Sequence, residues 1–133
     1  MIKKGLIIGI VNLIVGVILN FGFNAIFPTL GTEYQNPAIF RPWQDPLMLV
    51  FFAYPFIFGF VAVYFWNMIG KNFTGNETQK AFQFAKLYFI IATIPGMFAT
   101  YTSFQISFLM ILNWTLVGFI DAYIAGYILA KIK

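Results

Sequence analysis

Charged residues divide the chain into long uncharged stretches. Residues 5–32, 46–70 and 87–120 contain no Asp, Glu, Lys or Arg. A helix needs about 20 apolar residues to cross a hydrocarbon core of about 30 Å, so each of the first two stretches fits one crossing. The third is too long for one helix, and the polar run at residues 100–105 indicates a tight turn inside it. The pattern therefore predicts four crossings.

The predicted fold class is all-α: an integral membrane antiparallel four-helix bundle in which short loops make sequential helices neighbours. The expected spans are residues 5–27, 46–70, 80–101 and 106–130. They form a single transmembrane domain, residues 1–133, with loops at 28–45 and 71–79. The first apolar run is longer than the core of a secretory signal and has no small-residue cleavage site, so we expect it to remain as the first crossing.

Composition agrees with this pattern. Of the 133 residues, 61% are hydrophobic and 9% are charged, whereas soluble domains carry about 25% charged residues. A chain this short leaves much of its surface exposed and cannot hide so many apolar side chains from water. We therefore expect the lipid bilayer to cover them.

The basic residues predict the orientation. All of the lysines fall at the two termini or in and beside the second loop: Lys3, Lys4, Lys71, Lys80, Lys86, Lys131 and Lys133. Only Arg41 falls in the first loop. Four crossings place all seven lysines on one side, so both termini are expected in the cytoplasm. The compact architecture favours the plasma membrane of a prokaryote. The net charge of +4 is explained by the membrane topology, so we do not expect the protein to bind nucleic acid.

The residue types that are missing exclude several kinds of chemistry. Without Cys or His the chain has no disulfide, no thiolate and none of the commonest metal ligands. Four acidic residues leave no visible nucleophile–base pair. We predict no catalytic residue, no metal site and no cofactor.

Polar groups inside the spans are the candidate functional residues, because each is costly in lipid unless it is paired or faces a cavity. Asp121 is the only acidic residue within a predicted span, about nine residues or ~14 Å from the cytoplasmic end. Lys86 and Asn12 enter from the same side to a similar depth, so the three are expected to converge. Such a cluster either binds a cation or carries protons, or it fixes the register of the helices.

A second polar group belongs to the opposite leaflet. Its members are Asn20, Asn24, Thr100, Thr102, Ser103 and Ser107. They either cap the turn between the third and fourth helices or coordinate a solute. Asn12, Asn20 and Asn24 also share one stripe of the first helix, at ~100° per residue. Small residues expected to allow close helix packing are Gly5, Gly9, Gly16, Gly118, Ala122 and Gly126.

Three classes of function remain open. The first in rank is a non-catalytic membrane module, either an accessory subunit of another membrane protein or a self-associating protein. The second is a small ion or solute channel or transporter that uses Asp121 and the asparagine stripe. A membrane enzyme acting on a lipidic substrate ranks third, because no reactive pair is visible.

Overall fold

A computed structural model describes residues 1–132, and every regular element in that part of the chain is helical. The elements are α1 Ile2–Ile26, α2 Pro28–Tyr34, η1 Pro46–Ala53, α3 Tyr54–Ile69, η2 Gly70–Asn72, α4 Glu77–Tyr88, η3 Phe89–Thr93, α5 Ile94–Ser103 and α6 Phe108–Lys131. The 3-10 turns η1 and η2 extend α3, and the π-helical segment η3 joins α4 to α5.

Four helical segments are long and apolar enough to cross a membrane, as in a multi-pass membrane protein. They are Ile2–Ile26, Pro46–Asn72, Glu77–Ser103 and Phe108–Lys131. Only 17–28% of the most apolar window of each segment is buried within the protein. The remaining apolar surface must be covered by another apolar medium, and lipid is that medium in a bilayer. The predicted all-helical fold with four spans is confirmed.

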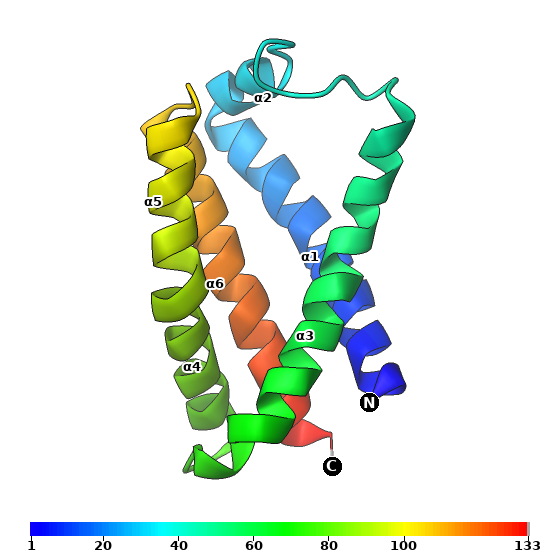
Figure 1. Cartoon of the computed structure of the whole chain (residues 1–133), viewed down its shortest axis with the longest axis vertical. Coiled ribbons are helices and arrows are strands. Elements are labelled where there is room, and N and C mark those ends of the chain that lie inside the picture. The colour runs from blue at the N-terminus through cyan, green and yellow to red at the C-terminus, as the bar shows by residue number, and fades with distance from the viewer. Residues whose placement is uncertain (133) are drawn as a thin grey trace.

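Both described chain ends lie at the same end of the bundle, beside the turn at residues 70–76 (Figure 1). Lys3, Lys4, Lys71 and Lys131 belong to this end, and we call it the lysine end. The Lys4 ammonium group donates a hydrogen bond to the carbonyl oxygen of Ile132 at 2.8 Å, which holds the two chain ends together. Lys133, which the orientation argument also uses, lies outside the described residues. The opposite end, which carries α2, is called the cap end.

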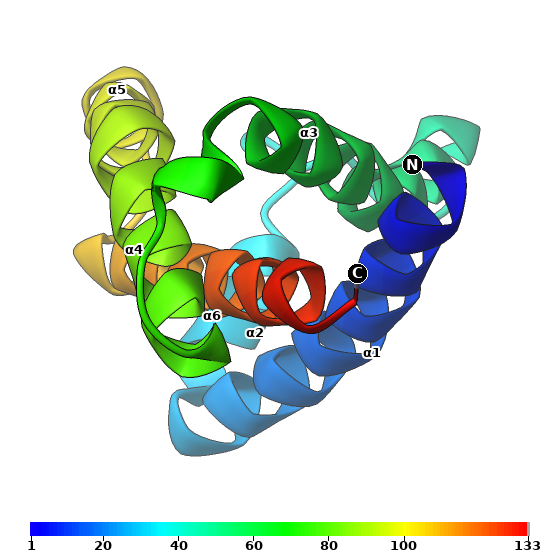
Figure 2. The same cartoon turned by 90° about the horizontal axis from the view of Figure 1, so that it is seen from below.

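The helices pack mainly in two pairs, α1 with α3 and α4 with α6, and α6 also contacts α1 and α3 (Figure 2). Their shared core is made of side chains from the lysine-end half: Ile8, Phe58, Ala62, Val63, Phe84, Ala85, Ala122, Ala125 and Leu129. Helices α3 and α4 meet through aromatic rings, for example Phe58 against Tyr88 at 5.2 Å and Trp66 against Phe84 at 5.8 Å between centroids. Aromatic side chains therefore fill the space between these two sequential helices.

Burial differs between the two halves of the second and third crossings. Helices α3 and α4 each bury residues, whereas η1 and α5, which continue them to the cap end, bury none. In Figure 1 the cap ends of these two crossings diverge while their lysine ends approach each other. The changes in helix type coincide with this difference: η1 ends just before Pro55, and the π-helical segment η3 ends just before Pro95. Proline cannot donate the backbone hydrogen bond that a regular helix requires.

Glycines allow the two helix pairs to approach closely. A Cβ atom at Gly59 on α3 would overlap the carbonyl oxygen of Gly5 and would lie 3.2 Å from the backbone nitrogen of Gly9 on α1. A Cβ atom at Gly126 on α6 would lie 2.9 Å from Cα of Ala81 on α4. Gly118 has only Thr93 nearby, at 3.8 Å, and Gly16 has nothing within 4 Å. The close backbone contacts are therefore at Gly5, Gly9, Gly59 and Gly126.

The variant Gly59→Ala tests the contact between α1 and α3. Its methyl group has no space unless the two backbones separate, so the free energy of unfolding should fall by about 1–3 kcal/mol. Unfolding can be followed by tryptophan fluorescence during titration of mixed micelles with a denaturing detergent. The matched control is Gly16→Ala, which has open space and should unfold at the wild-type midpoint or above it. Equal destabilisation by the two substitutions would contradict this packing.

The first loop is more ordered than the sequence indicated, because its first residues form the short helix α2. Pro28 begins this helix, in the position where its missing N–H group costs nothing. Leu30 of α2 is completely buried. The third span also starts earlier than expected, at Glu77 instead of residue 80, because Asn76 and Gln79 form a reciprocal capping box.

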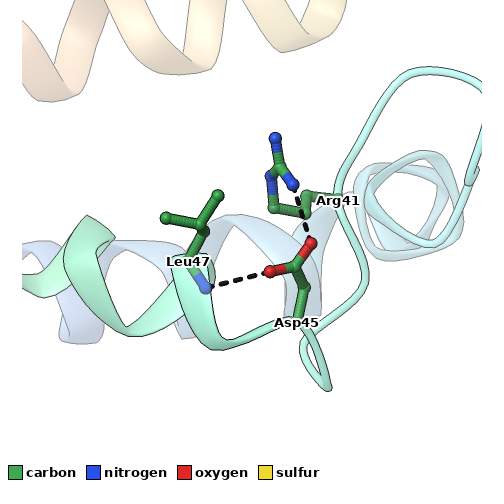
Figure 3. A network of polar contacts seen from close by, with 3 residues as sticks. All are labelled: Arg41, Asp45 and Leu47. Carbon is green, nitrogen blue, oxygen red and sulfur yellow. Dashed lines mark hydrogen bonds and ion pairs between the residues drawn. The ribbon is translucent and has the colours of Figure 1, made fainter.

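The loop ends at a polar junction that starts the second crossing (Figure 3). One Asp45 carboxylate oxygen accepts a hydrogen bond from the backbone N–H of Leu47 at 2.9 Å and so caps the N-terminus of η1. The other oxygen pairs with the Arg41 guanidinium group at 2.7 Å. The Arg41 and Leu47 hydrogen bonds hold the pKa of the Asp45 carboxyl below its usual value.

This junction predicts a pH dependence. Because the pKa of Asp45 is lowered in the folded protein, its stabilising effect is complete above the pKa of the unfolded chain, about 3.9. The effect is lost as the pH falls through the lower folded value. Arg41→Gln should raise the pKa of Asp45 toward the usual value, as measured by carbon NMR of the carboxyl groups in micelles. An identical titration of wild type and variant would rule out the ion pair in solution.

A candidate polar site at mid-membrane depth

Asp121 lies near the middle of the last crossing. It is thirteen residues from the start of α6 and ten from its end, or roughly 20 Å and 15 Å at 1.5 Å per residue. Its carboxyl oxygen Oδ1 is buried and accepts no hydrogen bond. Within residues 1–132 the single salt bridge joins Arg41 to Asp45, so no cation pairs with Asp121 there. A carboxyl group in this situation is expensive to ionise unless something else compensates its charge.

Asn12 approaches the same place from α1. Its side chain is 2% exposed, and its amide nitrogen donates a hydrogen bond to the backbone carbonyl oxygen of Asp121 at 3.2 Å. The amide oxygen of Asn12 is buried and has no hydrogen-bond partner. The contact therefore joins the first crossing to the last and leaves a second polar oxygen uncompensated.

Two tyrosines bring the second and third crossings to this level. Tyr54, at the start of α3, and Tyr88, at the end of α4, lie close enough to each other and to Asp121 for a charge on one of these groups to affect the others. The ring of Tyr88 packs edge-on against Phe58. Asn12, Tyr54, Tyr88 and Asp121, one residue from each crossing, are called the polar cluster below.

The polar cluster lies where the packed half of the bundle meets the open half. Tyr54 follows directly on η1, which buries no residue, and 53% of its surface is exposed. Tyr88 directly precedes η3, and π-helical segments of this kind often occur at functional sites. The cluster thus has a buried side at Asn12 and an exposed side at Tyr54.

The predicted site residues are only partly brought together. Asn12 contacts Asp121, whereas the Lys86 side chain is exposed. A second buried amide, Asn113, lies two turns from Asp121 toward the cap end of α6 and also has an unpartnered oxygen. Among residues 1–132 no group of three His, Cys, Asp or Glu side chains is placed to hold a metal ion.

The residues predicted for the opposite leaflet divide into separate local contacts. Asn24 donates to the backbone and side-chain oxygens of Asn20 one turn earlier on α1. Thr100 and Thr102 each bond to carbonyl oxygens of their own helix α5. Ser103 has an exposed side chain at the end of α5.

Ser107 instead caps α6 together with a residue of the first loop. Its hydroxyl accepts a hydrogen bond from the backbone N–H of Met110 at 3.1 Å. The same hydroxyl and the Ser107 backbone N–H each donate to the carboxylate of Glu33, both at 2.6 Å. Glu33 therefore places negative charge at the positive end of the α6 dipole.

Aromatic residues extend this cap. Trp114 of α6 donates an indole hydrogen bond to the Tyr34 hydroxyl at 2.6 Å, and the Phe40 ring packs edge-on against Trp114. Burial raises the pKa of Tyr34, so its hydroxyl stays neutral at physiological pH. These contacts hold the first loop against the start of α6.

The variant Glu33→Gln tests the cap. It removes the negative charge from the N-terminus of α6, so the free energy of unfolding should fall by about 1 kcal/mol. The matched control is Glu77→Gln, which also removes a negative charge from the first turn of a helix, α4, but breaks no side-chain hydrogen bond to another element in the described part of the chain. Glu33→Gln should therefore destabilise the protein more than this control does. Denaturing-detergent titrations of both variants measure the difference. A Glu33→Gln protein as stable as wild type would show that the cap contributes no net stability.

Sequence reasoning missed three residues of these sites: Tyr54, Tyr88 and Glu33. Nothing in the sequence distinguishes Tyr54 and Tyr88 from the other five of the seven tyrosines. Their proximity depends on how α3 and α4 are aligned, which the sequence pattern does not show. Glu33 could have been considered from the sequence, because it is one of only four acidic residues and lies in the first loop.

Searches with the whole chain against protein-family models, curated proteins and solved structures find no match.

Proposed function

We propose that this protein is a non-catalytic membrane module that associates with a second copy of itself through α5. The observation that carries the proposal is that α5 and η1 bury no residue, although they make up the cap-end halves of two crossings. A self-associating module needs such a surface outside its own core.

The chemistry of α5 favours a second copy as the partner. One side of η3 and α5 carries four exposed small residues, Ala92, Gly96, Ala99 and Ser103. Their spacing contains the small-xxx-small pattern twice, which allows two helix backbones to approach closely in lipid. A Cβ atom at Gly96 would meet nothing within 4 Å, so this side is open to a neighbour. Because residues 89–103 are uncharged, two identical copies can meet face to face around a twofold axis without repulsion between like charges.

A small ion channel or transporter is the second candidate, and the polar cluster is the observation that favours it. Such a protein needs an ion bound at this depth. The uncompensated oxygens of Asn12 and Asp121 supply acceptors for one.

The test of self-association is Gly96→Ile. The new side chain has room within the protomer but would hold two α5 helices apart, so the dimer dissociation constant should rise about tenfold. Energy transfer between labelled proteins in liposomes, over a series of lipid-to-protein ratios, measures the constant.

The matched control is Gly22→Ile on α1, where a Cβ atom also meets nothing within 4 Å. It should dimerise as wild type does. A wild-type protein that stays monomeric at every lipid ratio, or equal dimerisation of the two variants, would overturn the proposal. Native mass spectrometry of the wild type would then identify any different partner.

A further inference from the structure

We infer that the polar cluster binds one monovalent cation, a proton or an alkali metal ion, between Asp121 and the oxygens of Asn12, Tyr54 and Tyr88. The inference concerns binding at this site and does not depend on self-association.

Two acceptors at this site are unsatisfied: the side-chain oxygens of Asn12 and Asp121 are both buried without a hydrogen-bond partner. Buried polar atoms in native proteins nearly always have one, and the bilayer raises the cost of leaving them alone. Only 2% of the Asn12 surface is exposed, and the hydrogen bond to the Asp121 carbonyl oxygen orients its amide group. In this structure neither oxygen accepts a hydrogen bond from a neighbouring side chain, so each remains available to a donor or a cation.

The ionised site carries little charge. The titratable groups from neighbouring helices that affect Asp121 are Tyr54 of α3 and Tyr88 of α4. A tyrosine has an ordinary pKa of about 10, so both phenols are neutral at physiological pH. Helix α1 contributes the uncharged Asn12, and Lys86 of α4 is exposed. The ionised cluster thus carries a single negative charge. One positive charge neutralises it, whereas a divalent cation would leave the site positive inside a bilayer.

The chemistry of the donor atoms also favours a hard cation or a proton. The cluster presents one carboxyl, one amide carbonyl and two phenolic oxygens, with neither sulfur nor imidazole. Hard cations prefer oxygen ligands of this kind. A proton fits the same atoms, since a protonated Asp121 becomes a donor to a neighbouring oxygen.

The experiment uses infrared difference spectroscopy of the full chain in liposomes. The chain has four acidic residues in all, so the C=O stretching band of a protonated carboxyl group can be assigned by substitution. One series raises Na⁺ at constant pH and constant ionic strength, with choline as the replaced ion. The other series raises the pH without Na⁺.

Loss of a protonated-carboxyl band on adding Na⁺ supports an alkali metal ion as the ligand, and loss only on raising the pH supports a proton. The band should be absent from Asp121→Asn and present in the matched control Glu77→Gln. A wild-type band that is unchanged by Na⁺ and by pH up to the limit of protein stability would overturn the inference, because Asp121 would then be permanently neutral.

Tyr88→Phe keeps the result interpretable if Asp121→Asn does not fold. It retains the ring that packs on Phe58 and removes one hydroxyl from the cluster. The midpoint of the Na⁺ or proton titration should shift by about threefold to tenfold, the effect of one hydrogen bond. Tyr64→Phe, whose exposed ring lies elsewhere on α3, should titrate as wild type. Equal midpoints for both tyrosine variants and the wild type would contradict the site.

Discussion

Close approach of backbones at glycine is the constraint on which the rest of this bundle depends. Gly59 fits against the backbone of Gly5 and Gly9, and Gly126 fits against Ala81. Inside a bilayer, helices gain little from burying apolar side chains against each other, so close packing of this kind supplies much of the attraction. Because all of these contacts lie in the lysine-end half, the helices are held together there. The second and third crossings then diverge toward the cap end, where η1 and α5 bury no residue.

The polar cluster occupies the boundary between these two halves. Toward the lysine end the buried core, which includes Phe58 and Ala122, consists of hydrophobic side chains. Toward the cap end the second and third crossings are exposed to lipid. At the boundary each of the four crossings contributes one polar residue to the cluster. One of these residues, Tyr54, is exposed. The same geometry that leaves α5 free for a second copy therefore gives the cluster an exposed side.

Much of the fold could be predicted from the sequence because it depends on local properties. Uncharged runs of membrane-spanning length predicted the four crossings, and the second was expected to start at residue 46, where η1 begins. Helix α2 was missed because its seven residues are too few to show a periodic pattern. Site residues depend on the alignment of one helix with another. The depth of each residue along its span was enough to predict that Asn12 lies beside Asp121. Depth does not show which side of α4 faces the other helices, so Lys86 was expected at this site and Tyr88 was not.

The most direct measurement is the separation of the second and third crossings at their two ends. The chain has no cysteine, so pairs of single cysteines can carry spin labels without background. One pair, at Leu49 on η1 and Phe98 on α5, reports the cap end; the other, at Met68 on α3 and Phe82 on α4, reports the lysine end. All four side chains are exposed. The account predicts a longer distance for the cap-end pair in liposomes. Equal distances, or a shorter one at the cap end, would contradict a bundle that is closed at one end and open at the other.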